Sequence, residues 1–241
     1  MKSIKRIWNS FKIAFSMYSR IPMPRSEWTD ENKSYAMCFF PWIGAVIGLL
    51  SYGVFRFSKW FDGNGGGNYS LFFVIFLILI PVFITGGIHL DGFLDVSDAM
   101  SSWQERDRRL EILKDSHAGA FAIICCAVYF VLYAGAVSLI EARTFQPLIF
   151  VYVMLRSVSG LSIVCLKLAK NTGLAATFSD GASKKVIRVW LSVYLILCAG
   201  VMCWLNLALG VLCAGVVLLV FLYFRHMVYR YFGGINGDMA G

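Results

Sequence analysis

Three aspartates follow directly on a long apolar stretch of the sequence. Asp91, Asp95 and Asp98 lie in the segment GGIHLDGFLDVSDAM, residues 86–100. Their spacing of i, i+4 and i+7 places the three carboxylates along one face of a helix. Like charges so arranged repel one another, and charge beside a membrane segment is costly unless it is compensated. The spacing therefore predicts a positive group bound between them.

A second acidic pair follows in the same polar region. Glu111 and Asp115 are again four residues apart, in the amphipathic segment ERDRRLEILKDSHAGAF, and the short link SSWQERD lets this segment fold back on the first helix. Oxygen ligands without nearby thiolates select a hard cation, so the predicted occupant is Mg²⁺, with Mn²⁺ or Ca²⁺ as substitutes. Mg²⁺ commonly binds one or two carboxylates together with substrate phosphates. The cluster thus indicates phosphoryl or phosphodiester transfer, with two alternatives: aspartates that only cap helix ends, and a pathway for ions.

The remaining sequence is typical of a polytopic membrane protein. Of its 241 residues, 59% are apolar and only 15% are charged, which lies outside the usual range of soluble domains. Several runs approach the roughly 20 apolar residues that a helix needs to cross a bilayer. We predict an all-α transmembrane helix bundle that forms a single domain over residues 1–241. The expected spans are 38–58, 70–89, 120–140, 146–168, 186–206 and 208–230.

Two further features refine this bundle. Pro81 and the sequence Thr85-Gly86-Gly87 predict that the second span is kinked and opens near the acidic cluster. The N-terminal segment MKSIKRIWNSFKIAFSMYSRIPMP lacks the long apolar core of a cleaved signal peptide. Its apolar and basic residues fall on different helical faces, which predicts a helix lying on the membrane surface.

The distribution of basic residues predicts the orientation. Eighteen of the 22 lysines and arginines fall on the side of the N-terminus, three on the other side, and Arg156 lies inside the fourth span. Cytoplasmic loops carry such an excess, so the N-terminus, the aspartates, the loop 167–185 and the C-terminal segment are all expected at the cytoplasmic face. The net charge of +8 also fits attraction to anionic phospholipid, and no nucleic-acid-binding module is evident.

The sequence resembles the cobalamin synthase family, the adenosylcobinamide-GDP ribazoletransferases. The motifs that carry the resemblance are SRIPMP (19–24), FFPWIGAVIG (39–48), GGIHLDGFLDVSDAM (86–100), RRLEILKDSHAGAF (108–121), LRSVSG (155–160), NTGLAATF (171–178) and GGINGDMAG (233–241). The resemblance implies a Mg²⁺-dependent phosphotransferase of the bacterial inner membrane, active at the cytoplasmic face. Such an enzyme joins α-ribazole, or its 5′-phosphate, to adenosylcobinamide-GDP: the ribose 3′-hydroxyl attacks the phosphorus on the aminopropanol arm and GMP leaves. Membrane lipid is the other expected partner, and the oligomeric state stays open.

The resemblance also assigns roles to residues of this sequence. It implies that Asp91, Asp95, Asp98 and Asp115 coordinate the metal and the diphosphate, with Glu111 as a second-rank ligand, and that Asp95 or Asp115 accepts the hydroxyl proton. The implied substrate-binding residues are Arg20, His89, Lys114, Arg156 and Asp238. An ion pair with the aspartates is an equal alternative for Arg156, and a structural hydrogen bond is one for His89. Members of the family usually continue past GGINGDMAG into another apolar helix, whereas this sequence ends at Gly241.

Two other functions remain as alternatives. A cation-coupled transporter would use the aspartates as an ion relay, but it predicts charges near the middle of several spans, and only Arg156 is so placed. A CDP-alcohol phosphotransferase would share the chemistry and differ in the acceptor. Its signature has an alanine and an arginine after the Asp-Gly pair, whereas Asp91-Gly92 is followed here by Phe-Leu-Asp.

Overall fold

Helices make up most of the residues that the structure describes. The computed structural model describes residues 2–63, 70–115, 117–169 and 182–240. Its helices are α1 (Lys2–Tyr18), α2 (Asp30–Ser34), the 3₁₀ helix η1 (Ala36–Phe39), α3 (Phe40–Gly63), α4 (Ser70–Thr85), α5 (Ile88–Ser101), α6 (Arg106–Ile112), α7 (Ala120–Ser138), α8 (Ala142–Cys165), α10 (Ala182–Leu205), α11 (Leu207–Tyr231) and α12 (Gly237–Ala240). Within these ranges the only β pairing is an isolated parallel bridge between Leu168 and Ile235. The predicted all-α class is confirmed.

Among the described residues, five continuous helices are long and apolar enough to cross a membrane. They cover Ala36–Asp62, Ala120–Ser138, Thr144–Cys165, Ser183–Leu205 and Leu207–Tyr231. The helices at 71–85 and 88–101 pass the same test only as a pair, and they meet at an angle of 94°. Five of the six predicted spans are therefore confirmed as continuous helices, and the second span is broken.

The break lies at two glycines. Pro81 is accommodated inside α4, and the chain turns at Gly86 and Gly87, whose φ angles are +65° and +82°. L-residues with a side chain rarely adopt such angles. The side chain of Arg20 also occupies the space that a Cβ atom of Gly86 would fill, and the Arg20 backbone N–H donates to the Ile84 carbonyl at 2.8 Å. The predicted kink is confirmed, and its cause is the glycine pair.

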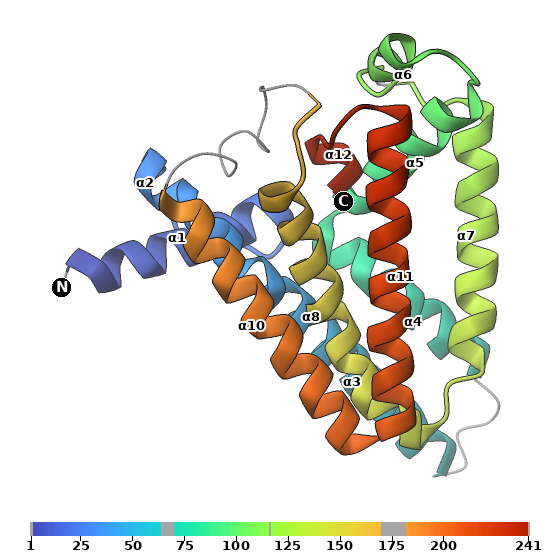
Figure 1. The fold of residues 1–241 in the computed structure, drawn as a ribbon. Helices are drawn as coiled ribbons and strands as arrows, with labels where there is room; N and C mark the ends of the chain where they lie inside the picture. Colours follow the sequence, from blue (N-terminus) through green and yellow to red (C-terminus); the bar gives the residue numbers. More distant parts are fainter. Residues whose placement is uncertain (1, 64–69, 116, 170–181, 241) are drawn as a thin grey trace.

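The bundle core is centred on α8. This helix packs against α3 on one side and α10 on the other, and α11 packs on α10 and α8. The α3–α8 contact is close because Gly44 and Gly48 face the backbone of Tyr152 and Ile149, with no room for a Cβ atom at either glycine. The fully buried side chains Ile43, Ile47, Leu191 and Met202 fill the interior. α7 stands at the edge, where it packs on α4 and α5 (Figure 1).

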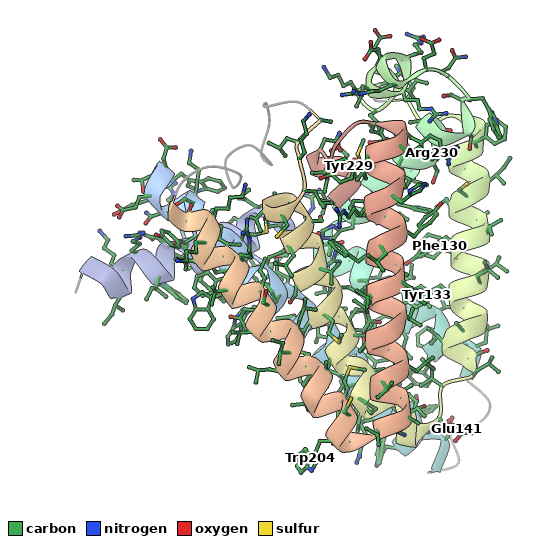
Figure 2. All side chains as sticks on the ribbon, viewed as in Figure 1. Phe130, Tyr133, Glu141, Trp204, Tyr229 and Arg230 are labelled. Carbon is green, nitrogen blue, oxygen red and sulfur yellow. The ribbon has the colours of Figure 1, made fainter. Side chains whose placement is uncertain are left out.

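The predicted cytoplasmic elements gather at one end of the bundle. α1, α2, α6 and α12 lie at this end in Figure 1. Figure 2 shows Glu141, just before α8, and Trp204, in the last turn of α10 (Ala182–Leu205), at the opposite end. The first half of α1 exposes Ile4, Ile7 and Trp8, whereas Ile13 and Phe15 in its second half are buried in the bundle. The N-terminal helix is confirmed, and its position on the membrane surface stays a prediction.

Candidate active site

The α5 aspartates meet the C-terminal segment of the chain. α12 packs against α5, and the Asp238 carbonyl sits where a Cβ atom of Gly92 would be. Asp91 is exposed, Asp95 is half-buried, and Asp238 adds a carboxylate from the other end of the sequence. We call Asp91, Asp95 and Asp238 the carboxylate group. A glycine at position 92 is what lets the two backbones approach so closely.

Local contacts hold α12 in this position. The Ser159 hydroxyl of α8 donates a hydrogen bond to the Ala240 carbonyl. Before α12, the Ile235 N–H donates to the Lys167 carbonyl and the Ala169 N–H donates to the Ile235 carbonyl, both at 2.8 Å. Met239 and Ala240 are buried. The described part of the motif GGINGDMAG, residues 233–240, is thus packed against the bundle.

Burial and mutual repulsion both act on the carboxylate group. Asp95 lies on α5, outside the five continuous spans. Burial raises its pKa to about 6, and the charges of Asp91, Asp238 and Asp98 act in the same direction. Loss of solvent also raises the pKa of Asp238, with Asp91 contributing. Neighbouring negative charges disfavour ionisation in this way until a cation joins them.

Asp98 has a structural partner in α7. Its carboxylate accepts hydrogen bonds from the backbone N–H groups of Gly119 and Ala122, the latter at 2.8 Å. These N–H groups belong to the first turn of a helix, where they have no partner within the helix. A negative charge there also interacts favourably with the helix dipole. Asp98 therefore caps α7, the alternative role that the sequence left open for these aspartates.

The second acidic pair does not join the carboxylate group. α6 ends at Ile112, so the predicted amphipathic helix is shorter than its sequence segment. Glu111 is exposed and forms an ion pair with Arg108 at 2.7 Å. The exposed Asp115 carboxylate binds the ring of His117 at 2.8 Å, and hydrogen bonds from His117 lower the pKa of Asp115. Lys114 is exposed beside them. The expected convergence of these residues with α5 is not seen.

The carboxylate group fits only part of a magnesium site. Among the described residues, no three His, Cys, Asp or Glu side chains lie close enough to hold a metal ion by themselves. Mg²⁺ is usually bound by one or two carboxylates, with water and substrate phosphates completing an octahedron. Two carboxylates with hard oxygen atoms suit that kind of site. Two of the three residues Asp91, Asp95 and Asp238 would hold the ion, with water and substrate phosphates as the other ligands.

The predicted basic residues separate into two places. Arg20 packs against Gly86, in the turn just before α5. Arg156 instead faces the interior of the bundle, where its guanidinium lies 5.6 Å from the centre of the Phe40 ring. Within the described part of the chain it forms no ion pair, so the expected pairing with the aspartates is not observed. The imidazole of His89 borders the same interior cavity, and both its buried nitrogens lack a hydrogen-bond partner among the described residues.

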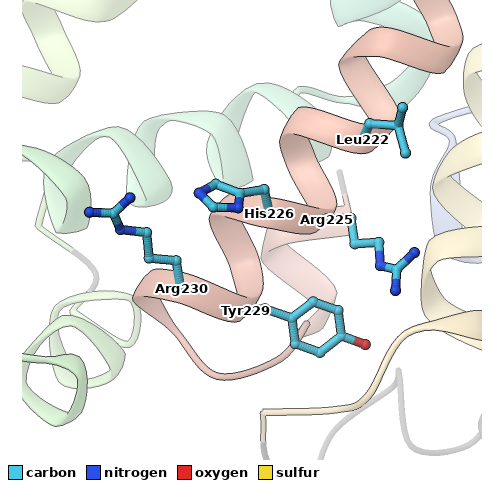
Figure 3. Close-up of a pocket in the computed structure, with 5 residues that line it drawn as sticks. All are labelled: Leu222, Arg225, His226, Tyr229 and Arg230. Carbon is cyan, nitrogen blue, oxygen red and sulfur yellow. The ribbon is translucent and has the colours of Figure 1, made fainter.

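Another group of basic residues lies on the outer side of α11. Leu222, Arg225, His226, Tyr229 and Arg230 line a shallow pocket of about 560 Å³. In Figure 3, Arg225 and Arg230 point to opposite sides of the helix. All five side chains are exposed, at the end of the bundle where basic residues were expected. Basic residues at the end of a membrane helix are typical of its cytoplasmic side, which agrees with the predicted orientation.

Two positions near the site were not singled out in the sequence. Arg106 of α6 packs over Gly233, and the buried Arg109 stacks on Tyr231 with its guanidinium carbon 4.8 Å from the ring centre. They join α6 to the end of α11, just before α12. The glycines at 233 and 234, both with positive φ, were the only local signal that a side chain would pack closely there. The motif NTGLAATF, residues 171–178, lies outside the described residues.

Comparisons with known proteins agree along the whole chain. The family described as cobalamin-5-phosphate synthase matches residues 10–241. A protein of Lachnoclostridium phytofermentans named adenosylcobinamide-GDP ribazoletransferase is 43% identical over 97% of this chain and 87% of its own length. Proteins of the same name from Clostridium perfringens strain SM101 and Geobacillus thermodenitrificans are each 32% identical over 99% of this chain, and over 93% and 91% of their own lengths. No solved structure matches the chain.

Proposed function

The chain belongs to the cobalamin-5-phosphate synthase family, and we propose that it joins α-ribazole, or α-ribazole 5′-phosphate, to adenosylcobinamide-GDP with release of GMP. The relatives named adenosylcobinamide-GDP ribazoletransferase align with nearly the entire chain, so the similarity includes all helices of the bundle. We further propose that the reaction requires Mg²⁺ and takes place at the cytoplasmic face of the bacterial inner membrane. The excess of basic residues at the end that carries α5 and α12 supports this orientation.

The observation that carries the proposal is the meeting of α5 and α12. It brings Asp91, Asp95 and Asp238 together from positions almost 150 residues apart in the sequence. A diphosphate carries several negative charges, so a site rich in carboxylates binds it only together with a cation. The bound ion would neutralise charge on the diphosphate as GMP departs. Arg20, beside the start of α5, is the basic residue best placed to contact the phosphates.

The residues of the chain then have distinct tasks. The ribose 3′-oxygen forms a bond to the phosphorus on the aminopropanol arm, and the bond from that phosphorus to the oxygen of GMP breaks, with GMP taking the electron pair. The proton of the 3′-hydroxyl passes to a carboxylate. Asp95 suits this task because its raised pKa of about 6 makes it a stronger base than an ordinary aspartate. Asp91 and Asp238 bind and orient the diphosphate.

Asp115 is the other candidate base, together with Glu111 and Lys114 as neighbouring ligands. These residues act in the reaction only if the segment after α6 moves toward α5 when substrate binds. Their exposed positions and local partners leave them free to do so. The variant Asp115→Asn tells whether Asp95 or Asp115 is the base.

The test is GMP release from adenosylcobinamide-GDP and α-ribazole by protein reconstituted in vesicles, measured against Mg²⁺ concentration. Asp91→Asn and Asp95→Asn are expected to lower turnover by about a hundredfold or more. Asp107→Asn is a matched control, since Asp107 is an exposed aspartate of α6 outside the carboxylate group. Near-normal turnover of the folded Asp91 and Asp95 variants would refute the proposed site. A loss confined to Asp115→Asn would move the base to the segment after α6.

A further inference from the structure

A large cavity lies inside the bundle, beside the carboxylate group but not lined by Asp91, Asp95 or Asp238. Its volume is about 810 Å³, and α4, α5, α7, α8, α11 and α12 all contribute to its lining. Most of its walls are apolar side chains, such as Leu77, Ile149 and Val217. The hydroxyl groups of Tyr133 and Tyr152 lie 2.9 Å apart and link α7 to α8. A cavity of this size is in the range of sites that hold small molecules.

The cavity opens toward the bilayer beside α11. Leu212, Val216 and Val220 line it, yet their side chains are 62%, 49% and 56% exposed. All three lie within the span Leu207–Tyr231, so the medium at this opening is hydrocarbon. α7 packs on α4 and α5, whereas α11 packs on α10 and α8. In the view of Figure 2, the label of Tyr133 lies between the ribbons of α7 and α11.

The part of the cavity nearer the cytoplasmic end is polar and unsatisfied. Arg156 and His89 line it there, without an ion pair for the guanidinium or a hydrogen bond for the imidazole among the described residues. A charge inside a membrane bundle is costly unless it faces a partner of opposite sign. Phe40 contributes only a cation–π contact to Arg156. The cavity thus combines an apolar channel with donors for an anion.

We propose that this cavity binds a phospholipid of the surrounding membrane. The phosphate contacts Arg156 and His89, and an acyl chain fills the apolar part. From Arg156 to Phe145, the lining residue near the other end of α8, the helix rises about 16 Å. This rise is close to half the thickness of a hydrocarbon core of about 30 Å, so the apolar part is long enough for one acyl chain. Lipid is always present at the opening, so the apolar walls need not stay empty.

Lipid retention by the purified protein tests the proposal without any assay of transfer. Delipidated protein in mild detergent is titrated with dioleoylphosphatidylglycerol, and bound lipid is counted by native mass spectrometry. The expected result is saturation at one tightly bound lipid per chain. Val216→Trp narrows the opening and is expected to weaken binding about tenfold or more. Val211→Trp is the matched control, because Val211 is on the same helix, 58% exposed, and does not line the cavity.

A second variant tests the polar end. Arg156→Gln removes the charged donor and is expected to weaken lipid binding about tenfold or more. Equal binding by Val216→Trp and Val211→Trp would overturn the proposal. So would displacement of the lipid by millimolar GMP or pyrophosphate, which would assign Arg156 to a soluble phosphate. A photoreactive residue at position 216 should label lipid; a link to a second copy of the chain would instead show that this face is a dimer interface.

Discussion

Substitutions of Asp98 distinguish a helix-capping role of this residue from a metal-binding role. Its carboxylate accepts two backbone hydrogen bonds from the first turn of α7. Hydrogen bonds to a charged group contribute about 1.5–3 kcal/mol each, and loss of a helix cap typically costs about 0.5–2 kcal/mol. We therefore expect Asp98→Ala to lower the free energy of unfolding by about 2–3 kcal/mol. Asp98→Asn keeps one acceptor oxygen and should lose about half as much.

These values correspond to a measurable change in melting temperature. For a chain of this size, 1 kcal/mol shifts the melting temperature by about 2–4 °C, so Asp98→Ala should melt about 4–12 °C below wild type in detergent. Asp107→Asn serves as the control and should melt close to wild type. Transfer by folded Asp98→Asn in vesicles should stay within about tenfold of wild type. Unchanged melting of the Asp98 variants together with loss of turnover would refute the cap and return Asp98 to the metal site.

Two further predictions concern the backbone around the site. Gly86→Ala should destabilise the protein by at least about 1 kcal/mol, because position 86 has positive φ and Arg20 fills the Cβ space. The control Gly53→Ala, with open space around its Cβ atom, should be neutral or slightly stabilising. Equal melting temperatures of the two variants would contradict this account of the bend. Ser159→Ala removes the hydrogen bond to the Ala240 carbonyl. It should speed amide hydrogen exchange in residues 237–240, with little change in α3. Unchanged exchange would mean that burial of Met239 alone holds α12.

Much of the fold follows from local sequence patterns. Apolar runs of membrane-spanning length predicted the spans, because the length of a helix is matched to the bilayer. The i, i+4, i+7 spacing predicted that Asp91, Asp95 and Asp98 share a helix, and they lie together on α5. The glycines at 86 and 87 predicted the bend, although a sequence contains no measure of its angle, which is 94°.

The site was less predictable because its contacts are distant in sequence. Asp238 reaches Gly92 only once α8 and α11 have placed the C-terminal segment, and no local pattern contains that packing. The role of Asp98 depends on where α7 begins, relative to α5 in space. Glu111 and Asp115 had the correct spacing for one helix face, but α6 ends before Asp115. Each carboxylate instead has a partner nearby in the sequence: Arg108 pairs with Glu111, and His117 with Asp115.

The bend after α4 has a consequence for the surrounding lipid. The described part of α4 has 16 residues and is therefore about 24 Å long, shorter than the hydrocarbon thickness of about 30 Å. A bilayer responds to such a mismatch by thinning locally, at a modest energetic cost. Water and headgroups then descend to the level where α5 starts. We expect the hydrophilic nucleotides of the proposed reaction to reach the aspartates through this depression, without entering the hydrocarbon core.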